Sequence, residues 1–131
     1  MSEEHQRLLS FRAGSRLFGV DESMVATVAA WRQPTPLPHA PPAVMGIVSL
    51  QGRMLTVLDL RKLTGAESAD NTTPQHVIAL RGDEQLALAV DEVEGSIELP
   101  NDTNGSQVEV INVSALFSLA IQGRERRQRR F

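Results

Sequence analysis

The feature of this sequence that most restricts its fold is a series of short apolar runs separated by two-residue turn signals. Gly14-Ser15, Gln51-Gly52 and Gly82-Asp83 each lie between two such runs. A two-residue link that contains glycine is typical of a β-hairpin. Few segments carry the 3.6-residue apolar period of a long amphipathic helix. The sequence therefore predicts a mostly β fold with a few short helices.

The predicted elements follow from these turns and from local capping signals. The hairpins pair residues 8–13 with 16–20, 46–50 with 53–58, and 76–81 with 85–90; further extended segments are expected over 26–32, 93–99 and 108–113. Single-turn helices are expected over 23–25, over 60–64 after a cap at Asp59 and before Gly65, and over 114–119 after a cap at Ser114. Five prolines in the nine residues 34–42 predict a stiff surface connection.

An internal repeat suggests two related lobes. Residues 57–63 and 110–116 share the pattern V-[LI]-[DN]-[LV]-x-x-L at an offset of 53 residues. An apolar strand, a cap-forming Asp or Asn and a leucine one turn later describe a strand that feeds a short helix. We therefore expect one domain over residues 1–123, with sub-lobes at about 20–65 and 76–119 to which the N-terminal strands contribute, and a basic tail over 124–131.

Composition narrows the compartment and the partners. The chain has no cysteine, no apolar run long enough to cross a bilayer and an acidic start, so a cytoplasmic protein without direct membrane insertion is expected. The last eight residues carry a net charge of +4, whereas the other 123 sum to −7. This tail either is simply solvated or touches an acidic partner, a membrane surface or nucleic acid. The acidic body, with one Trp and no Tyr, argues against nucleic-acid binding.

Chemistry-bearing residues form no catalytic or metal-binding pattern. The titratable candidates are His5, His39, His76, Asp21, Asp59 and Asp91. No two histidines stand one helical turn apart, and no Gly-x-Ser-x-Gly or Gly-Lys-Ser/Thr motif occurs. Asp59 is better explained as a helix cap, and His39 as a hydrated loop residue. The sequence therefore predicts a protein that is not an enzyme and has no catalytic residues, metal or cofactor.

The segment from Gly46 to Arg61, GIVSLQGRMLTVLDLR, resembles the block G-V-I-x-L-R-G-x-I-x-P-V-[IV]-D-L-R of the CheW-like domain family of bacterial chemotaxis coupling proteins. Three further segments resemble the family in order along the chain: Phe18-Gly19-Val20-Asp21, Pro36-Leu37-Pro38, and the run 87–93, which ends in V-D-x-V. The resemblance covers roughly residues 8–119.

This resemblance implies two intertwined five-stranded SH3-like β-barrels with no catalysis of their own. It implies a signal-transduction adaptor that links the cytoplasmic tips of chemoreceptors to the regulatory domain of a histidine kinase in a two-component chemosensory array, near membrane-bound receptors. An alternative keeps the fold but makes the chain a localisation or regulatory scaffold for a non-receptor protein. A small β-barrel enzyme or ligand-binding domain is a third alternative.

Partner binding is expected to use apolar grooves and strand edges. The predicted partner-binding residues are Val25, Thr27, Val28, Ile47, Ser49, Gln51, Gly52, Arg53 and Val90. For the apolar members Val25, Val28, Ile47 and Val90, a place in the core is an equally open interpretation, because alternating apolar residues in strands usually point inward.

Two departures from the family pattern bear on partner choice. Thr27 and Gln51 stand where the family commonly has Glu and Arg. If the two positions face each other, a neutral pair replaces an ionic one and the surface suits an atypical partner; the alternative is that both are simply tolerated surface residues. The stretch between Leu99 and Val108 is shorter than usual and polar. It predicts that the second lobe lacks a strand and that the exposed edge supports homo-oligomer formation or addition of a partner strand.

Overall fold

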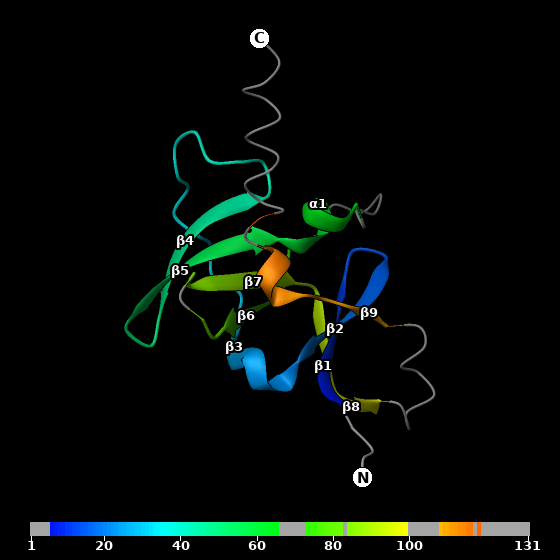
Figure 1. Ribbon diagram of the computed structural model, residues 1–131. Coiled ribbons are helices and arrows are strands. Elements are labelled where there is room, and N and C mark those ends of the chain that lie inside the picture. The colour runs from blue at the N-terminus through cyan, green and yellow to red at the C-terminus, as the bar shows by residue number, and fades with distance from the viewer. Residues whose placement is uncertain (1–5, 66–72, 83, 100–107, 117, 119–131) are drawn as a thin grey trace.

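The computed structural model describes residues 6–65, 73–82, 84–99, 108–116 and 118, which form two β-sheets (Figure 1). The elements are β1 (Gln6–Ala13), β2 (Arg16–Asp21), the 3₁₀ turn η1 (Glu22–Met24), β3 (Val25–Ala30), β4 (Val44–Leu50), β5 (Arg53–Asp59), α1 (Leu60–Thr64), β6 (His76–Leu80), β7 (Leu86–Val90), β8 (Glu92–Leu99) and β9 (Glu109–Val110). A helical turn follows over residues 113–116. The predicted mostly β fold with short helices is confirmed.

The three predicted hairpins are present, and their turns explain them. β1 pairs with β2, β4 with β5 and β6 with β7, all antiparallel. Gly14 has φ 64°, and Gln51 and Gly52 have φ 50° and 79°. The Gln51-Gly52 turn, with positive φ at both central residues, has a twist that matches the twist of the two flanking strands. The middle of the third turn, at Asp83, lies outside the described residues.

The two sheets are intertwined along the chain. The strand order is β8-β1-β2-β9 in the four-stranded sheet and β3-β6-β7-β5-β4 in the five-stranded sheet. The chain therefore starts in the first sheet, builds all of the second and then returns. In this arrangement β6 and β7 pair with β3 and β5 and not with β8 and β9. Continuous apolar runs favour such central positions, where both faces of a strand are covered.

The two sheets repeat one pairing scheme. β3 is antiparallel to β6 as β8 is to β1, and β5 is parallel to β7 as β9 is to β2. β4 has no counterpart among the described strands of the four-stranded sheet. Residues 100–107, where the sequence analysis expects the strand to be missing, lie outside the described part of the chain.

Two apolar clusters fill the molecule. The inter-sheet cluster comprises the buried residues Phe11, Ala13, Phe18, Val20, Leu58, Leu60, Ile78, Leu80, Leu86, Leu88, Val90 and Leu116. The second cluster comprises Val48, Leu50, Leu55, Val57, Val77, Ala79, Ala87 and Ala89, all from the five-stranded sheet. Successive residues of β6 and β7 alternate between the two clusters, so these two strands are buried on both faces.

The repeated strand-to-helix motif has one cap in each copy. The Asp59 Oδ1 atom accepts a hydrogen bond from the backbone N–H of Arg61 at 3.0 Å, and the Asn112 Oδ1 atom accepts one from Ser114 N–H at 3.0 Å. Gly65 ends α1 in the left-handed conformation, with φ 75°. The expected cap at Ser114 is thus corrected to Asn112, because a short amide side chain reaches the N–H two residues on.

Arg16 ties the two copies of this motif together. Its Nη1 atom donates to the carbonyl oxygen of Thr64, at the end of α1, at 2.8 Å. Its Nη2 atom lies 2.6 Å from a carboxylate oxygen of Glu109 in β9, and its guanidinium carbon lies 5.7 Å from the centre of the Phe18 ring. One side chain of β2 therefore links a helix that follows the five-stranded sheet to the last strand of the four-stranded sheet.

Replacing Asp59 by Ala should lower the free energy of unfolding by about 1–2 kcal/mol, because the N-cap bond is lost. Asn112→Ala removes the matching bond at an exposed site and should cost less, about 0.5 kcal/mol. Urea denaturation followed by circular dichroism measures both. Asp59→Asn keeps an accepting oxygen and serves as the control. A loss in Asp59→Asn equal to that in Asp59→Ala would assign the effect to the carboxylate charge beside Arg61 instead of the cap.

Candidate protein-interaction surface

The hairpin formed by β4 and β5 projects from one end of the molecule (Figure 1). Its inward residues, among them Val48 and Leu55, belong to the core, and the alternate residues face outward. The outward cross-strand pairs are Ile47 with Thr56 and Ser49 with Met54. Met54 is 59% exposed, which is more than any other large hydrophobic residue in the described part of the chain. The hairpin therefore presents a mixed apolar and hydroxyl-bearing face.

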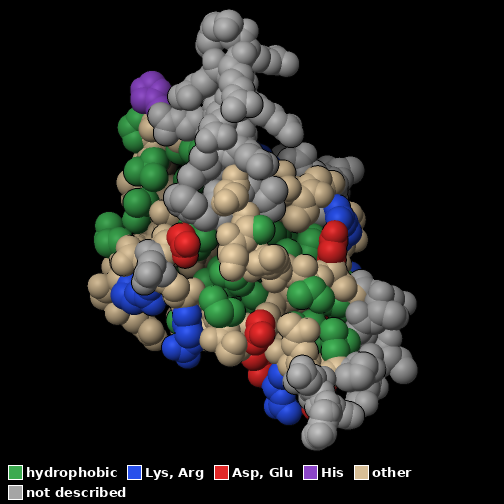
Figure 2. All heavy atoms as spheres, in the orientation of Figure 1, with side chains coloured by type: hydrophobic (Ala, Val, Ile, Leu, Met, Phe, Trp, Pro, Cys, Tyr) green, Lys and Arg blue, Asp and Glu red, His purple; other side chains and the backbone are tan. Residues whose placement is uncertain are grey.

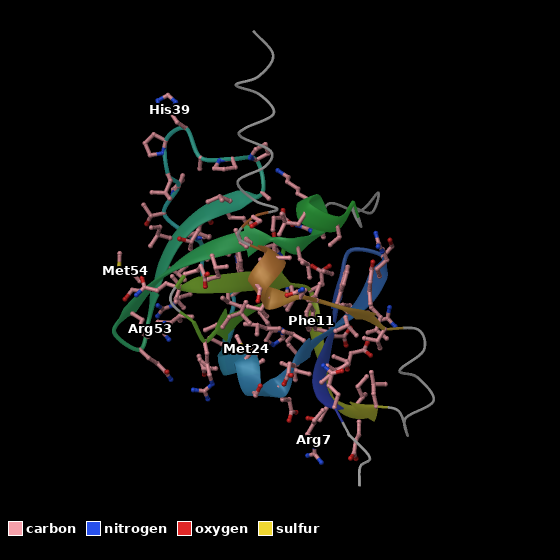
Figure 3. All side chains as sticks on the ribbon, viewed as in Figure 1. Arg7, Phe11, Met24, His39, Arg53 and Met54 are labelled. Carbon is pink, nitrogen blue, oxygen red and sulfur yellow. The ribbon has the colours of Figure 1, made fainter. Side chains whose placement is uncertain are left out.

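The tip of this hairpin is held rigidly. Gln51 and Gly52 are exposed and form the turn, with Leu50 and Arg53 paired on either side. Figure 3 shows Arg53 beside Met54 at this end of the molecule. A two-residue turn with both residues at positive φ has few alternative conformations, so a partner would meet a surface that is already formed.

The proline-rich segment fastens to the outer edge of β4. Thr35 and Ile47 exchange backbone hydrogen bonds of 2.8 and 2.9 Å. Arg32 Nη1 donates to the Ser49 carbonyl at 2.6 Å. Gly46 has φ 143°, and a Cβ atom there would lie 2.2 Å from the Thr35 carbonyl oxygen, so only glycine allows the close approach. These contacts protect the edge of β4 and fix the hairpin against the rest of its sheet.

Hydrophobic side chains gather along the same side of the molecule. Figure 2 shows them in green from the region below His39 down to the hairpin tip, where basic side chains begin. Leu37, in the proline-rich segment, is 41% exposed and adds to the exposed apolar surface. An exposed apolar area with a polar rim is typical of a protein-binding site.

The predicted residues of β3 lie on a different strand edge. Thr27 is half-buried and pairs with Ala79, and Val28 is 39% exposed and pairs with Ile78. In the five-stranded sheet, β3 and β4 stand at opposite ends of the strand order. No hydrogen bond among the described residues joins Thr27 to Gln51. Thr27 and Gln51, the two residues that differ from the family pattern, therefore lie at separate places in this sheet.

The remaining predicted residues differ in accessibility. Val25 and Ile47 are partly buried, and Val25 packs against the inter-sheet cluster. Ser49, Gln51 and Gly52 are exposed. Val90 is 1% exposed and is a member of that cluster, so its side chain contributes to the core. The sequence analysis missed Met54, although its place opposite Ser49 follows from the two-residue period of the hairpin.

Asp21 fixes the start of β3. Its carboxylate accepts hydrogen bonds from the backbone N–H of Ser23 at 3.0 Å and from the Ser23 hydroxyl at 2.8 Å. These bonds, the backbone one most strongly, favour the ionised form and lower the pKa of Asp21 below its ordinary value of 3.8. The 3₁₀ turn that follows delivers the chain into β3.

The described part of the chain offers few groups for metal binding or acid–base chemistry. No group of three or more metal-ligating side chains occurs there. His39 is exposed at φ 62°, and His5 lies outside the described residues. The Nδ1 atom of His76 and the Oδ1 atom of Asp91 are buried without a hydrogen-bond partner. None of the helices within the described ranges is long and apolar enough to cross a membrane.

Comparison with known proteins gives consistent matches. A family model described as "CheW-like domain" matches residues 7–127. "Chemotaxis protein CheW" of Rhizobium meliloti is 36% identical over 73 residues, which are 56% of this chain and 46% of that protein. The same-named protein of Thermotoga maritima is 25% identical over 116 residues, 88% of this chain and 74% of that protein. "Protein PilI" of Pseudomonas aeruginosa is 31% identical over 101 residues, 76% of this chain and 57% of that protein.

A solved structure agrees with the fold. The crystal structure of scaffolding protein TtCheW from Thermoanaerobacter tengcongensis superposes with a TM-score of 0.64 at 26% identity, covering 72% of this chain and 65% of that one. The predicted fold class is thereby confirmed. The matched region spans about half the length of the two Rhizobium relatives, 46% and 50%.

Val90→Ala should lower the free energy of unfolding by about 2 kcal/mol, because two buried methyl groups are lost and a cavity is left. Val28→Ala, the same change at an exposed position, should stay within about 0.5 kcal/mol. Urea denaturation of both variants measures the difference. Equal losses would show that Val90 is less tightly packed than its burial indicates.

The pKa of Asp21 should rise partway toward 3.8 in Ser23→Ala, because the hydroxyl bond is lost while the backbone bond remains. A carboxyl-carbon NMR titration of wild type and variant measures it. Since the folded pKa is lowered, the stabilisation is present above the unfolded pKa and is lost as the pH falls through the folded pKa. An unchanged pKa in Ser23→Ala would show that the Ser23 hydroxyl does not contribute to the lowering.

Proposed function

Because the chain belongs to the CheW-like domain family, we propose that it acts as an adaptor that links chemoreceptors to a chemotaxis-type histidine kinase. We likewise propose that the chain is a scaffold and not an enzyme, which its family membership and its similarity to a scaffolding protein support. The partners proposed are the regulatory domain of the kinase and the cytoplasmic tip of a receptor. The protein would work in the cytoplasm, beside membrane-bound receptors.

The observation that carries this proposal is the rigid β4–β5 hairpin with its exposed Met54. An adaptor must hold two macromolecules in fixed geometry, which requires preformed surfaces instead of loops that order on binding. The two-residue turn and the bonds from Thr35 and Arg32 to β4 provide one such surface. Met54 and Ile47 supply apolar area, while Ser49, Gln51 and Arg53 supply hydrogen-bonding groups at the rim.

This arrangement, with apolar residues at the centre and polar residues at the rim, is typical of protein–protein interfaces. Burial of a few apolar anchors gives most of the affinity, and surrounding polar groups set register and exclude water. Met is unbranched and adapts to partners of different shape. Arg53, whose planar guanidinium offers five donors, suits carboxylate or backbone carbonyl groups of a partner.

A second candidate function is a localisation or regulatory scaffold for a non-receptor protein. The observation that favours it is the neutral side chain at each of two separate positions, Thr27 and Gln51, where the family commonly carries Glu and Arg. A partner that recognises those charges would bind this chain more weakly. A relative that carries a name other than CheW, "Protein PilI", matches 76% of this chain, which supports considering partners other than chemoreceptors.

Met54→Lys should weaken binding of the kinase regulatory domain at least tenfold, or by roughly 1.4 kcal/mol or more, because an apolar anchor of the interface is lost. Isothermal titration calorimetry with purified kinase and receptor fragments measures it. Val110→Lys, at an exposed apolar position of β9 in the other sheet, is the matched control and should bind each fragment as wild type does. Both variants should keep the wild-type urea midpoint.

The same titrations separate the two candidate functions. An array adaptor must bind both the kinase fragment and the receptor fragment. Binding of neither, by a folded protein, would rule out the array adaptor and favour the non-receptor scaffold. Wild-type affinity in Met54→Lys, with both partners bound, would move the binding site away from the β4–β5 hairpin.

A further inference from the structure

Among the described residues, no strand covers the end of the four-stranded sheet at β9, whereas β4 covers its counterpart β5. By the internal repeat, Val110 of β9 corresponds to Val57 of β5. Val57 pairs with Ala87 of β7 on one side and with Gly46 of β4 on the other, and it is 0% exposed. Val110 pairs with Gly19 of β2 and is 48% exposed. Val110 is thus exposed on the side where, in the five-stranded sheet, β4 covers Val57.

The backbone of β9 is oriented to accept another strand. The N–H of Ile111 donates to the carbonyl of Gly19 at 2.8 Å, so the neighbouring N–H and C=O of Val110 point away from β2. In the five-stranded sheet the N–H of Thr56, next to Val57, donates to the carbonyl of Gln85 at 2.9 Å. The N–H and C=O of Val57 likewise point away from β7, toward β4. No described residue pairs with the outer side of β9. An edge of this kind is a template for another strand.

The side chains of this chain indicate which strand can pair with the outer edge of β9. Residues 100–107 of this chain read PNDTNGSQ and contain no large apolar side chain that could cover Val110. The other edge of the same sheet, β8, carries Glu92, Glu94 and Glu98, and charges on an edge strand oppose strand addition. Arg12 neutralises one of these three acids, Glu94, whereas Arg16 neutralises Glu109, the single acid of β9.

We propose that β9 pairs with β9 of a second copy of this chain, antiparallel about a two-fold axis at Val110. The N–H and C=O of Val110 then bond to the same groups of the second copy, and the two Val110 side chains lie adjacent. This register places Glu109 opposite Ile111 of the second copy, so no two like charges are directly opposed. The interface is self-complementary and closes as a dimer.

This dimer goes beyond the proposed adaptor function and leaves its surface free. Figure 1 shows β9 beside β2, on the opposite side of the molecule from the β4–β5 hairpin. The two four-stranded sheets would join into one continuous sheet across the dyad. A failure of dimerisation would therefore be distinguishable from a failure of partner binding at Met54.

A single introduced cysteine tests the geometry directly, because the chain has none of its own. Directly opposite residues of a hydrogen-bonded antiparallel pair have Cα atoms about 5.5 Å apart, within the range that a disulfide can bridge. Val110→Cys should form a covalent dimer on mild oxidation of the full-length protein, as non-reducing electrophoresis would show. Met54→Cys, at a more exposed site, is the matched control and should stay mainly monomeric. Cross-linking of Met54→Cys as fast as Val110→Cys would overturn the proposal.

Sedimentation equilibrium gives an independent measurement. The wild type should dimerise reversibly, and Val110→Lys should raise the dimer dissociation constant at least roughly tenfold, because two like charges would meet at the dyad. Val110→Thr, which keeps β-branching, should retain the dimer. A wild type that is monomeric at every concentration tested, with no cross-linking of Val110→Cys, would overturn the proposal and leave this edge to a strand from another protein or from the chain itself.

Discussion

The structure depends on one hairpin, β6–β7, whose strands are buried on both faces. Alternate side chains of these strands enter the inter-sheet cluster and the cluster of the five-stranded sheet. β6 also pairs with β3 and β7 with β5, so the hairpin holds its own sheet together and supports the other sheet. A polar side chain at any of these positions would be buried against one core or the other. Both candidate interaction surfaces rest on this shared support.

The internal repeat explains why the two ends of the molecule differ in character. In the five-stranded sheet, β4 covers β5 and is itself fastened by Thr35 and Arg32, so this edge is closed and its outward side chains are presented rigidly. In the four-stranded sheet, the matching strand is not among those described, and β9 presents backbone groups as well as a side chain. One end therefore suits recognition by side chains and the other suits recognition by the backbone.

Local features were predictable from sequence, and non-local ones were not. The hairpin turns and the cap at Asp59 depend on residues that are neighbours along the chain, and these predictions are confirmed. The cap predicted at Ser114 is instead at Asn112. Both residue types favour the N-cap position, so only the geometry of the backbone distinguishes them. The pairing of β6 and β7 with β3 and β5 depends on contacts between distant segments. Val90 shows the same limit: it lies in the continuous apolar run LALAV, and only the central place of β7 in the strand order shows that both faces of this strand are covered.

The proposed dimer would couple the two surfaces without any contact between them. A dimer joined at β9 would carry two β4–β5 hairpins at its far ends, held in a fixed relation by the continuous sheet. When a partner offers two matching sites at that spacing, the second hairpin binds at a high effective concentration, and the overall affinity exceeds that of one hairpin with no new contact. Where the partner's sites are spaced differently, the rigid sheet forbids double engagement. A scaffold built in this way would select its assembly by geometry as well as by side-chain chemistry.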